Sequence, residues 1–582
     1  MIERIPAAGS MSFEARADMS RHFIQNAVDP CTGQPYFDVY YGSPVQMAHD
    51  WPDFGDLTAR YWEASYMIRD MTGRAPANMQ QLGDSLLGWM DSEDGLNYRP
   101  ETLYSINSAE LFDQGRTLSA LCSAYMAEGD PTIRAAMLGM VDGLIGISEA
   151  SEGYRSMPGS SYSHGTWNFW TMNSGYFVGP LIRPLVRAGE LLGYEPAIHL
   201  ASDLSRYVVE KAHMFGPNGE FVDHVHSRLA TAAGLFACGK VTGNSEWMEI
   251  AAKAWEYARE KSGPCGFVPE YLGEHAGQMR CETCSIMDYL DLTLLLALNG
   301  DASKWGEAER TLRNHLIESQ VSRADWASAG PIVPRDDLTL SDNVPKRMLG
   351  GFGGWTAFDY FFGMTPRATE GWLQRDVTPR DLYLEKRRMF QNCCGPAGLR
   401  ALYLVWSQSA VAQGDRLCVN MLVNRGIPEA AVSVGEAKDG AIELETVLKQ
   451  TLELDLRVPE WADESKVVTF ADGTPMRTII SGGRLRTGAL EAGSVVQIRF
   501  PCTGTREDFI VQHGNSPHET FSISFIGDSA VDVKRMSGGM TDQERAEASV
   551  LHDAYPLYAR NAFDVYSAEA FPRSVKASIN WF

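Results

Sequence analysis

The sequence has no run of about 18 apolar residues, and this absence excludes an ordinary membrane-spanning helix. It is also poor in basic residues, because 51 lysines and arginines stand against 74 aspartates and glutamates, a formal net charge of −23. Nucleic acids and anionic membranes both bind through basic surfaces, so we expect neither as a partner. The first residues lack a basic stretch followed by an apolar one. No signal peptide is therefore evident, and we expect a cytoplasmic protein.

Cysteine is scarce as well, with 10 residues in 582. In a long chain without an export signal, such cysteines are expected to be free thiols or metal ligands rather than disulfides. The apolar fraction of 44% and the charged fraction of 21% are typical of a folded globular protein. The length predicts two or three domains.

Helical periodicity dominates the first two thirds of the chain. One helical face carries a regular set of apolar residues, Ile133, Met137, Met140, Val141 and Leu144. Similar faces recur near residues 182–192 and 247–255, and loops rich in glycine, proline and aromatic residues separate them. Long helices joined by aromatic loops favour a helical barrel with a functional mouth, which we assign to residues 1–410.

The pattern changes to a period of two after residue 410. Apolar and polar residues alternate along 452–458, 496–500 and 521–525, as in antiparallel strands with one solvated face. Turn signals such as Asp472-Gly473 separate these stretches. We therefore predict a β-sandwich over residues 411–505, followed by a second β-sandwich or a C-terminal β extension over 506–582.

Two cysteine motifs are the most informative chemical signal, namely Cys281-Glu282-Thr283-Cys284 and Cys393-Cys394. Thiolates are soft ligands that suit zinc, and a carboxylate can complete a tetrahedron. One candidate site uses Glu282, Cys284, Cys393 and Cys394. A second is a closed structural site in which Cys281 replaces Glu282, and a third interpretation is that these cysteines are buried as small apolar side chains.

A zinc-bound cysteine is deprotonated and is therefore a nucleophile near neutral pH. It could attack an anomeric carbon to form a thioglycosyl intermediate, which water would release with overall retention. Such chemistry needs a separate general acid for the leaving oxygen. The carboxylic acids nearest the first motif are Glu270 and Glu274.

Several motifs together resemble glycoside hydrolase family 127, the β-L-arabinofuranosidase family, and the related family 146. The resemblance rests on Glu-Thr-Cys at 282–284, Asn-Cys-Cys at 392–394 and Gly-Glu at 273–274. The stretch Leu456-Arg457-Val458-Pro459-Glu460-Trp461 and the histidine at 226 also resemble family features. The resemblance extends from about residue 45 to about residue 500.

The resemblance implies a catalytic (α/α)6 barrel followed by β-sandwich domains, with zinc held by Glu282, Cys284, Cys393 and Cys394. It implies that Cys393 is the nucleophile and Glu274 the acid/base, and it leaves Cys281 without a role. The implied activity is that of a retaining, exo-acting, β-L-arabinofuranosidase-like enzyme of carbohydrate metabolism, with plant-derived oligosaccharides or other glycosides as substrates.

The chain departs from the family pattern at Arg116, where the family has a histidine in the sugar pocket. An arginine cannot accept a hydrogen bond and needs an anion when buried. That anion could be Asp113, one helical turn earlier, or the carboxylate of an acidic sugar. The segment between Glu274 and Glu282 is also shorter than in the family. Both departures concern the identity of the sugar.

Aromatic residues in polar surroundings offer platforms for a sugar ring, although many aromatics simply fill cores. The tryptophans of this kind are Trp51, Trp62, Trp167 and Trp170. Side chains that could bind hydroxyl groups are His164, Asp53, Asp56 and His226, the last preferred over its neighbour His224.

Two other functions fit the same sequence. One is a helical-barrel glycosidase that uses two carboxylates, Asp113 and Glu274, with purely structural cysteines. The other is a non-catalytic carbohydrate-binding protein stabilised by zinc. A homodimer is a further expected assembly of the chain.

Overall fold

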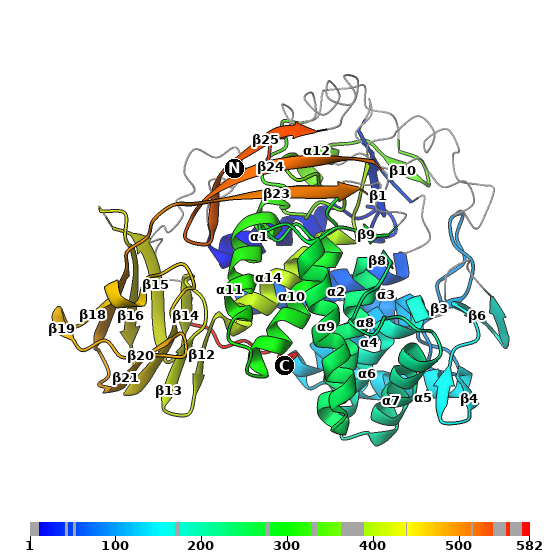
Figure 1. Cartoon of the computed structure of the whole chain (residues 1–582). Helices are drawn as coiled ribbons and strands as arrows, with labels where there is room; N and C mark the ends of the chain where they lie inside the picture. The colour runs from blue at the N-terminus through cyan, green and yellow to red at the C-terminus, as the bar shows by residue number, and fades with distance from the viewer. Residues whose placement is uncertain are drawn as a thin grey trace.

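The computed structural model describes residues 11–40, 45–49, 54–168, 175–273, 280–326, 335–361, 389–437, 439–513, 516–538, 555–558 and 573–582. It contains a helical barrel, a pair of packed β-sheets beside it and a three-stranded sheet across it (Figure 1). Within these ranges, no helix combines the length and the apolar content that a bilayer crossing requires.

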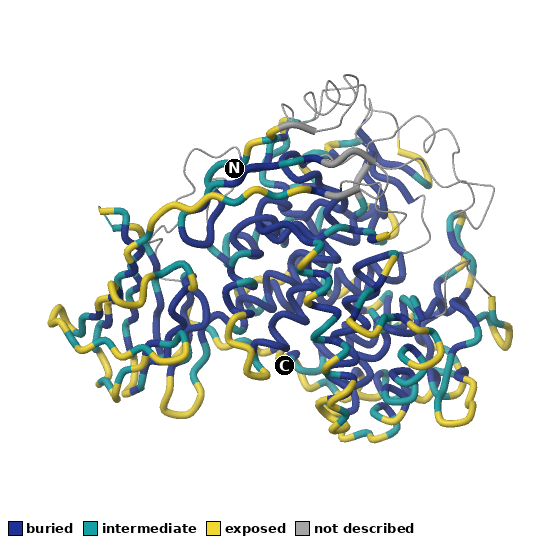
Figure 2. The backbone as a smooth tube through the Cα atoms, viewed as in Figure 1, coloured by how far each residue is buried: buried dark blue, intermediate teal, exposed yellow. Residues whose placement is uncertain are grey.

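Six helices form a closed inner ring, because each contacts the next and the last contacts the first. In ring order they are α2 (Phe54–Thr72), α4 (Leu111–Glu128), α6 (Gly175–Leu192), α8 (Val225–Thr242), α10 (Thr283–Leu298) and α14 (Cys394–Ser409). Most of their residues are buried on every side. The centre of the barrel is accordingly dark blue in Figure 2. Such all-round burial is expected of helices at the centre of a barrel.

An outer set of helices surrounds the ring, and most of its members are buried along one face only. They are α1 (Phe13–Asn26), α3 (Met79–Gly88), α5 (Pro131–Ile147), α7 (Glu195–Glu210), α9 (Ser245–Lys261) and α11 (Lys304–Thr311). The expected (α/α)6 barrel is thereby confirmed.

Short polar turns produce the alternation of inner and outer helices. Helix α4 ends at Gly129, whose φ of 66° is the left-handed conformation that glycine adopts without strain. Asp130 follows at once and caps α5, with Pro131 in the first turn. Gly243 and Asn244 repeat this arrangement between α8 and α9. The chain thus reverses direction within two residues.

The two packed sheets begin directly after α14. The five-stranded sheet has the order β12 (Ala410–Gln413), β13 (Arg416–Val419), β17 (Leu452–Arg457), β21 (Arg484–Leu490) and β20 (Ile480–Ser481). The six-stranded sheet has the order β14 (Arg425–Ile427), β15 (Ala430–Glu436), β16 (Ile442–Leu448), β22 (Val495–Phe500), β18 (Val468–Ala471) and β19 (Thr474–Met476). Pairing is antiparallel as expected, except that β13 and β17 run parallel.

The three-stranded sheet of β23 (Thr505–His513), β24 (Ser516–Ile526) and β25 (Ser529–Gly538) lies over the barrel (Figure 1). Phe521 of β24 stacks on Phe358 with ring centroids 4.5 Å apart. Residues 573–582 then return to the inner ring, where Trp581 is buried. The division of the chain into units at residues 410 and 505 stays a prediction.

Four small sheets complete the described structure. The largest has the order β10 (Thr339–Leu340), β2 (Gln46–Ala48), β1 (Asp38–Tyr40) and β11 (Met389–Gln391). The others comprise β3 (Ala109–Glu110), β6 (Ser161–Ser163) and β7 (Thr166–Asn168); β4 (Glu149–Ser151) and β5 (Tyr154–Ser156); and β8 (Asp223–His224) and β9 (Tyr271–Leu272). Short helical segments lie at η1 (Leu312–Leu316), α12 (Val344–Arg347) and η2 (Glu464–Lys466).

Candidate active site

Three sulfurs and a carboxylate converge where two inner helices begin. Glu282 is the N-cap of α10 and Cys284 is its second residue, while Cys393 is the N-cap of α14 and Cys394 its first residue. One ligand atom from each of these buried residues lies within 4.8 Å of the others. The residues predicted from the two motifs therefore come together, and we call them the thiol–carboxylate cluster.

Strand pairing delivers the two adjacent cysteines. Strand β11 pairs antiparallel with β1, in the register Asp38 with Gln391. Asn392 then donates from its backbone to the Phe37 carbonyl at 2.6 Å and from its side-chain amide to the Tyr36 carbonyl at 2.9 Å. These contacts fix the residue that immediately precedes Cys393.

The other half of the cluster is anchored by backbone and by a histidine. Cys281 exchanges both backbone hydrogen bonds with Thr356, which holds the chain just before α10. His224 Nε2 lies 3.0 Å from the Glu282 carboxylate, and the Ser285 hydroxyl donates to the same oxygen at 2.9 Å. Burial opposes the charged form, but the Glu282 carboxylate outweighs it and raises the pKa of His224. Among the described residues, Cys281 supplies no ligand atom to the cluster.

The three sulfurs share protons unequally. The Cys284 sulfur lies 3.4 Å from that of Cys394 and 3.9 Å from that of Cys393. Burial alone would raise the pKa of Cys284, but hydrogen bonds with the other two thiols and the Arg60 charge hold it well below its usual range. Hydrogen bonds with Cys284 and Cys394, together with burial, hold the pKa of Cys393 well above its usual range. Of these two thiols, Cys284 therefore loses its proton more readily than Cys393.

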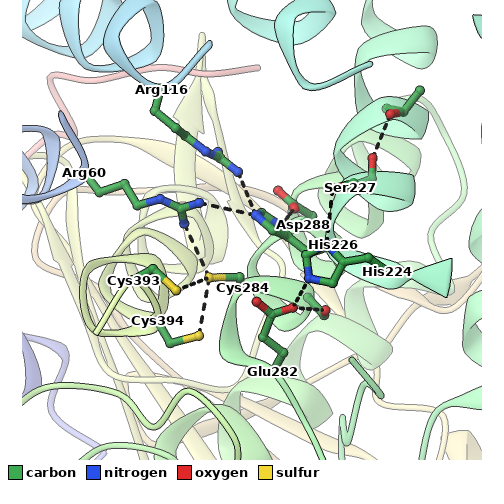
Figure 3. A network of polar contacts seen from close by, with 12 residues as sticks. Arg60, Arg116, His224, His226, Ser227, Glu282, Cys284, Asp288, Cys393 and Cys394 are labelled. Atoms are coloured by element: carbon green, nitrogen blue, oxygen red, sulfur yellow. Dashed lines mark hydrogen bonds and ion pairs between the residues drawn. The ribbon is translucent and has the colours of Figure 1, made fainter. Parts of the chain in front are cut away.

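An arginine–histidine network adjoins the cluster (Figure 3). Arg60 donates to the Asp56 carboxylate at 3.0 Å, approaches the Cys284 sulfur at 3.4 Å and lies 3.3 Å from His226 Nε2. The opposite ring nitrogen of His226, Nδ1, bonds to Asp288. Because Nε2 faces guanidinium donors and Nδ1 faces a carboxylate, the neutral tautomer with hydrogen on Nδ1 satisfies every partner.

Arg116 also belongs to this network. Its Nη2 lies 3.0 Å from His226 Nε2 and its Nε lies 3.6 Å from the Asp56 carboxylate. Burial and the nearby Arg60 lower the pKa of Arg116. Asp113 instead binds Arg99 through both carboxylate oxygens, at 2.5 and 2.7 Å, and is fully buried. The expected pair of Asp113 with Arg116 is thus replaced by Asp56 with Arg116.

The predicted sugar-binding residues have different fates. His164 and Trp167 lie on the β6–β7 hairpin, where His164 is exposed and stacks on Tyr98 at 4.7 Å and Trp167 packs against Tyr162. Strand β6 of this hairpin pairs with β3, which leads directly into α4. Trp62 was expected in a loop, but it lies within α2 and is buried there. The remaining predicted residues lie outside the described part of the chain: Trp51, Asp53, Trp170 and Glu274.

Glu270, the alternative general acid, is buried against a cation. Its carboxylate lies 3.0 Å from Arg280, which in turn covers the Trp355 ring at 4.3 Å. Burial outweighs this pairing and raises the pKa of Glu270. The ion pair occupies a carboxylate that would otherwise be available to a substrate.

Three polar residues of the site were missed or undervalued in the sequence. Arg60 lies four residues after Asp56 on α2, and Asp288 lies four residues after Cys284 on α10. Residues with this spacing share one face of a helix. That spacing was a usable signal. His224 contacts the cluster directly through Glu282, whereas the preferred His226 faces the two arginines.

Comparisons with known proteins agree with this architecture. No protein-family model matches the sequence, and no curated protein matches it. Among solved structures, a family 127 β-L-arabinofuranosidase from Geobacillus stearothermophilus T6 has a TM-score of 0.55 and 14% identity, over 89% of this chain and 80% of the other. A family 127 β-arabinofuranosidase has a TM-score of 0.54 and 14% identity, over 90% and 81% of the two chains. A protein described as a glycoside hydrolase has a TM-score of 0.55 and 13% identity, over 82% and 77%. The resemblance inferred from the motifs is thus confirmed at the level of the fold.

Proposed function

We propose that the protein is a zinc-dependent, retaining glycoside hydrolase with Cys393 as its nucleophile. The observation that carries this proposal is the convergence of Glu282, Cys284, Cys393 and Cys394 at the N-terminal ends of two inner helices. The partial positive charge of a helix N-terminus favours thiolate and carboxylate groups there. The likeness to family 127 folds agrees with it.

The donor set fits zinc. Four tetrahedral ligands with zinc–sulfur bonds of about 2.3 Å imply sulfur–sulfur separations of about 3.8 Å. The separations of 3.4 and 3.9 Å from Cys284 lie close to that value. Carboxylates that bind metals usually accept a hydrogen bond from a neighbouring group, and His224 occupies that position beside Glu282. Glu282, Cys284, Cys393 and Cys394 would hold the ion, which would keep the thiols deprotonated.

Among the three cysteines of the cluster, Cys393 has the largest exposed fraction, which supports it as the nucleophile. Its residue is 7% exposed, whereas Cys284 and Cys394 are both 0% exposed. The Cys393 thiolate would attack the anomeric carbon as the glycosidic bond breaks, which forms a carbon–sulfur bond and inverts that carbon. Water would then displace the sulfur with a second inversion, giving net retention. We assign the proton transfers to Glu274.

The sugar class follows from the charges beside the cluster. Arg116 and Arg60 both have the Asp56 carboxylate as a partner, and Asp288 lies behind His226. These two anions balance the two arginines, so the described residues beside the cluster offer no surplus cation to a carboxylated sugar. We propose an uncharged terminal sugar, with a β-L-arabinofuranoside of a plant-derived oligosaccharide as the leading candidate. Arg116 would bind one of its hydroxyl groups, and His226, which contacts Arg116 through Nε2 and Asp288 through Nδ1, would hold Arg116 in place.

The rival functions have less support. A mechanism with two carboxylates requires Asp113 at the substrate, but Asp113 is fully buried against Arg99. A zinc-stabilised carbohydrate-binding protein would not need its most exposed ligand to be a sulfur. Cytoplasmic location and a homodimer stay predictions.

The direct test combines metal analysis with a substrate screen. Purified protein should contain one zinc per chain, and hydrolysis of an aryl β-L-arabinofuranoside should be abolished by a strong chelator. Cys393→Ala should lower kcat by roughly three orders of magnitude or more while circular dichroism stays unchanged. A fully active sample without metal, or a mechanism-based label on a carboxylate instead of Cys393, would refute the proposal. Cys281→Ser is the matched control and should retain both zinc and activity.

A separate test addresses Glu274. Glu274→Gln should slow glycosides with poor leaving groups far more than activated aryl glycosides, because only the former need a proton in the first step. Equal losses on both substrates would remove Glu274 from this role. Glu270→Gln is the control, since Glu270 is engaged by Arg280.

A further inference from the structure

A second layer of polar and charged side chains lies one helical turn below the site. Glu63, Ser119 and Asp291 follow Arg60, Arg116 and Asp288 by three residues on α2, α4 and α10. One turn advances a helix by about 5.4 Å, so this layer lies deeper along the barrel axis. Arg183 of α6 and Arg400 of α14 complete it, and we call these five residues the second layer.

The second layer is internally paired. Arg183 Nη2 lies 3.1 Å from the Asp291 carboxylate, and Arg400 forms an ion pair with Glu63. The Ser119 hydroxyl donates to Glu63 at 3.1 Å. All five residues are buried, so each charge depends on its partner and on the direction in which that partner is held.

Trp581 contacts both arginines of this layer. Its carbonyl accepts a hydrogen bond from Arg183 at 2.7 Å, and the Arg400 guanidinium covers its ring at 4.3 Å. Its indole N–H donates to the Ser123 hydroxyl at 3.1 Å, and that hydroxyl donates to Glu63 at 2.8 Å. Trp581 is only 2% exposed.

The residues before Trp581 form hydrogen bonds with the inner helices α2 and α14. The Ser578 backbone donates to Asp70 of α2 at 2.8 Å, and the Ile579 backbone donates to the Tyr403 hydroxyl of α14 at 3.1 Å. A small cavity of about 20 Å³ is lined by Trp581 together with Arg116 and Asp288 of the site. That volume holds about one water molecule. Trp581 is therefore separated from the site by little more than the second layer.

From these contacts we infer that residues 578–582 close the floor of the barrel and that Trp581 is a positioning residue for the candidate active site. Trp581 keeps Arg400 on Glu63 and Arg183 on Asp291. Those pairings keep Glu63 and Asp291 from turning toward Arg60 and Arg116, one turn above. The arginines of the site thereby remain directed at Cys284 and His226. The effect on turnover rests on the proposed function, whereas the effect on the inner helices does not.

The test uses the full-length protein with three variants, Trp581→Ala, Trp581→Phe and Lys576→Ala. Trp581→Ala should lower kcat by about tenfold to a hundredfold with little change in KM, since small misplacements of catalytic groups have effects of this size. Amide hydrogen exchange should accelerate at residues 116–123 of α4 and 288–295 of α10, but not in the outer helix α9. Trp581→Phe retains a ring under Arg400 and should recover most of the loss. Lys576→Ala, at an exposed residue of the same C-terminal segment, is the control and should resemble wild type.

Two results would overturn the inference. One is wild-type exchange in α4 and α10 of Trp581→Ala. The other is exchange that accelerates equally in α9, because that pattern means general destabilisation rather than positioning. The exchange measurement needs no substrate. If wild type hydrolyses no glycoside while Trp581→Ala still loosens α4 and α10 locally, the proposed function fails but the closing role of Trp581 stands.

Discussion

The Arg60 guanidinium uses all three of its nitrogens in the candidate site. It joins an acidic partner, Asp56, to a sulfur of the cluster, Cys284, and to His226. Lysine has one charged nitrogen and could not hold three partners in one plane. The arrangement places a fixed cation beside the thiol–carboxylate cluster. With one zinc ion bound, three thiolates and a carboxylate would leave that cluster with a net negative charge.

Arg60→Met is therefore expected to weaken zinc binding by about tenfold to a hundredfold, the usual cost of losing a partner of a metal ligand. Competition with a chromophoric chelator measures the dissociation constant. Arg69→Met is the control, because Arg69 lies on the same helix but forms an exposed ion pair with Glu128. Equal affinities for wild type and Arg60→Met would show that Arg60 does not support the cluster.

A second residue-scale prediction concerns acid stability. His315 is fully buried between the Thr356 hydroxyl at 2.9 Å and the Tyr558 hydroxyl at 3.1 Å. Burial lowers its pKa from 6.5 to about 3. The unfolded chain therefore takes up a proton below pH 6.5 while the folded protein does not. Stability is full above that pH and falls as the pH drops toward 3.

At pH 5 this one residue should cost about 2 kcal/mol relative to pH 8. His315→Gln, which does not titrate, should remove that part of the acid sensitivity. Urea denaturation of both proteins at pH 8 and pH 5 gives the two differences. An identical pH dependence would show that other groups govern acid stability.

Residue-scale predictions from sequence succeeded where a motif was local and failed where partners were distant. Glu282 and Cys284 are two residues apart and Cys393 and Cys394 are adjacent, so each half of the cluster was visible. Arg99 could not be identified as the partner of Asp113, because nothing in the sequence tells which helix end meets which loop. The same holds for Arg60 and Cys284, which are 224 residues apart.

At the scale of helices and strands, the periodicity of apolar residues in the sequence predicts the elements well. The predicted face from Ile133 to Leu144 is the buried face of α5, and the alternation over 452–458 becomes β17. Close approaches between helices are less visible. At Gly179 of α6, an added Cβ would lie 1.8 Å from the Thr231 hydroxyl of α8, so glycine is needed there for packing rather than for backbone conformation.

Gly179→Ala should consequently destabilise the barrel by about 1–3 kcal/mol through overpacking. Gly139→Ala in the outer helix α5 is the opposite case, since its Cβ would meet only Gly95 at 3.9 Å. That change should stabilise by about 0.5–1 kcal/mol. Thermal unfolding followed by circular dichroism distinguishes the signs. Stabilisation by both substitutions would mean that α6 and α8 can move apart freely.

At the scale of the whole molecule, the barrel and the packed sheets meet at a buried ionic junction. Arg457, at the end of β17, binds Glu309 of α11 at 2.5 Å and Glu460 at 2.7 Å. Trp461 donates to Asp528, in the turn between β24 and β25, at 3.1 Å. The sequence stretch noted for its family resemblance therefore lies where three parts of the fold join.

Arg457→Met should lower the free energy of unfolding by about 3–5 kcal/mol, because Glu309 would remain buried without one of its cations. Arg499→Met removes a solvent-facing ion pair with Asp439 on the same pair of sheets and should cost about 1 kcal/mol or less. Urea denaturation of both variants measures the contrast. Similar small losses would mean that the junction is solvated in solution.

Ring closure by α14 also has a consequence for biosynthesis. The pair between Glu63 and Arg400 joins residues 337 positions apart. At synthesis rates of about 5–20 residues per second, Glu63 leaves the ribosome roughly 17–67 s before its partner. In the last part of that interval, after α10 is complete at Leu298, the inward sides of five helices lack the sixth. Because those sides carry arginine, glutamate and aspartate near the axis, the open intermediate presents less apolar surface to other nascent chains than a leucine-lined ring would.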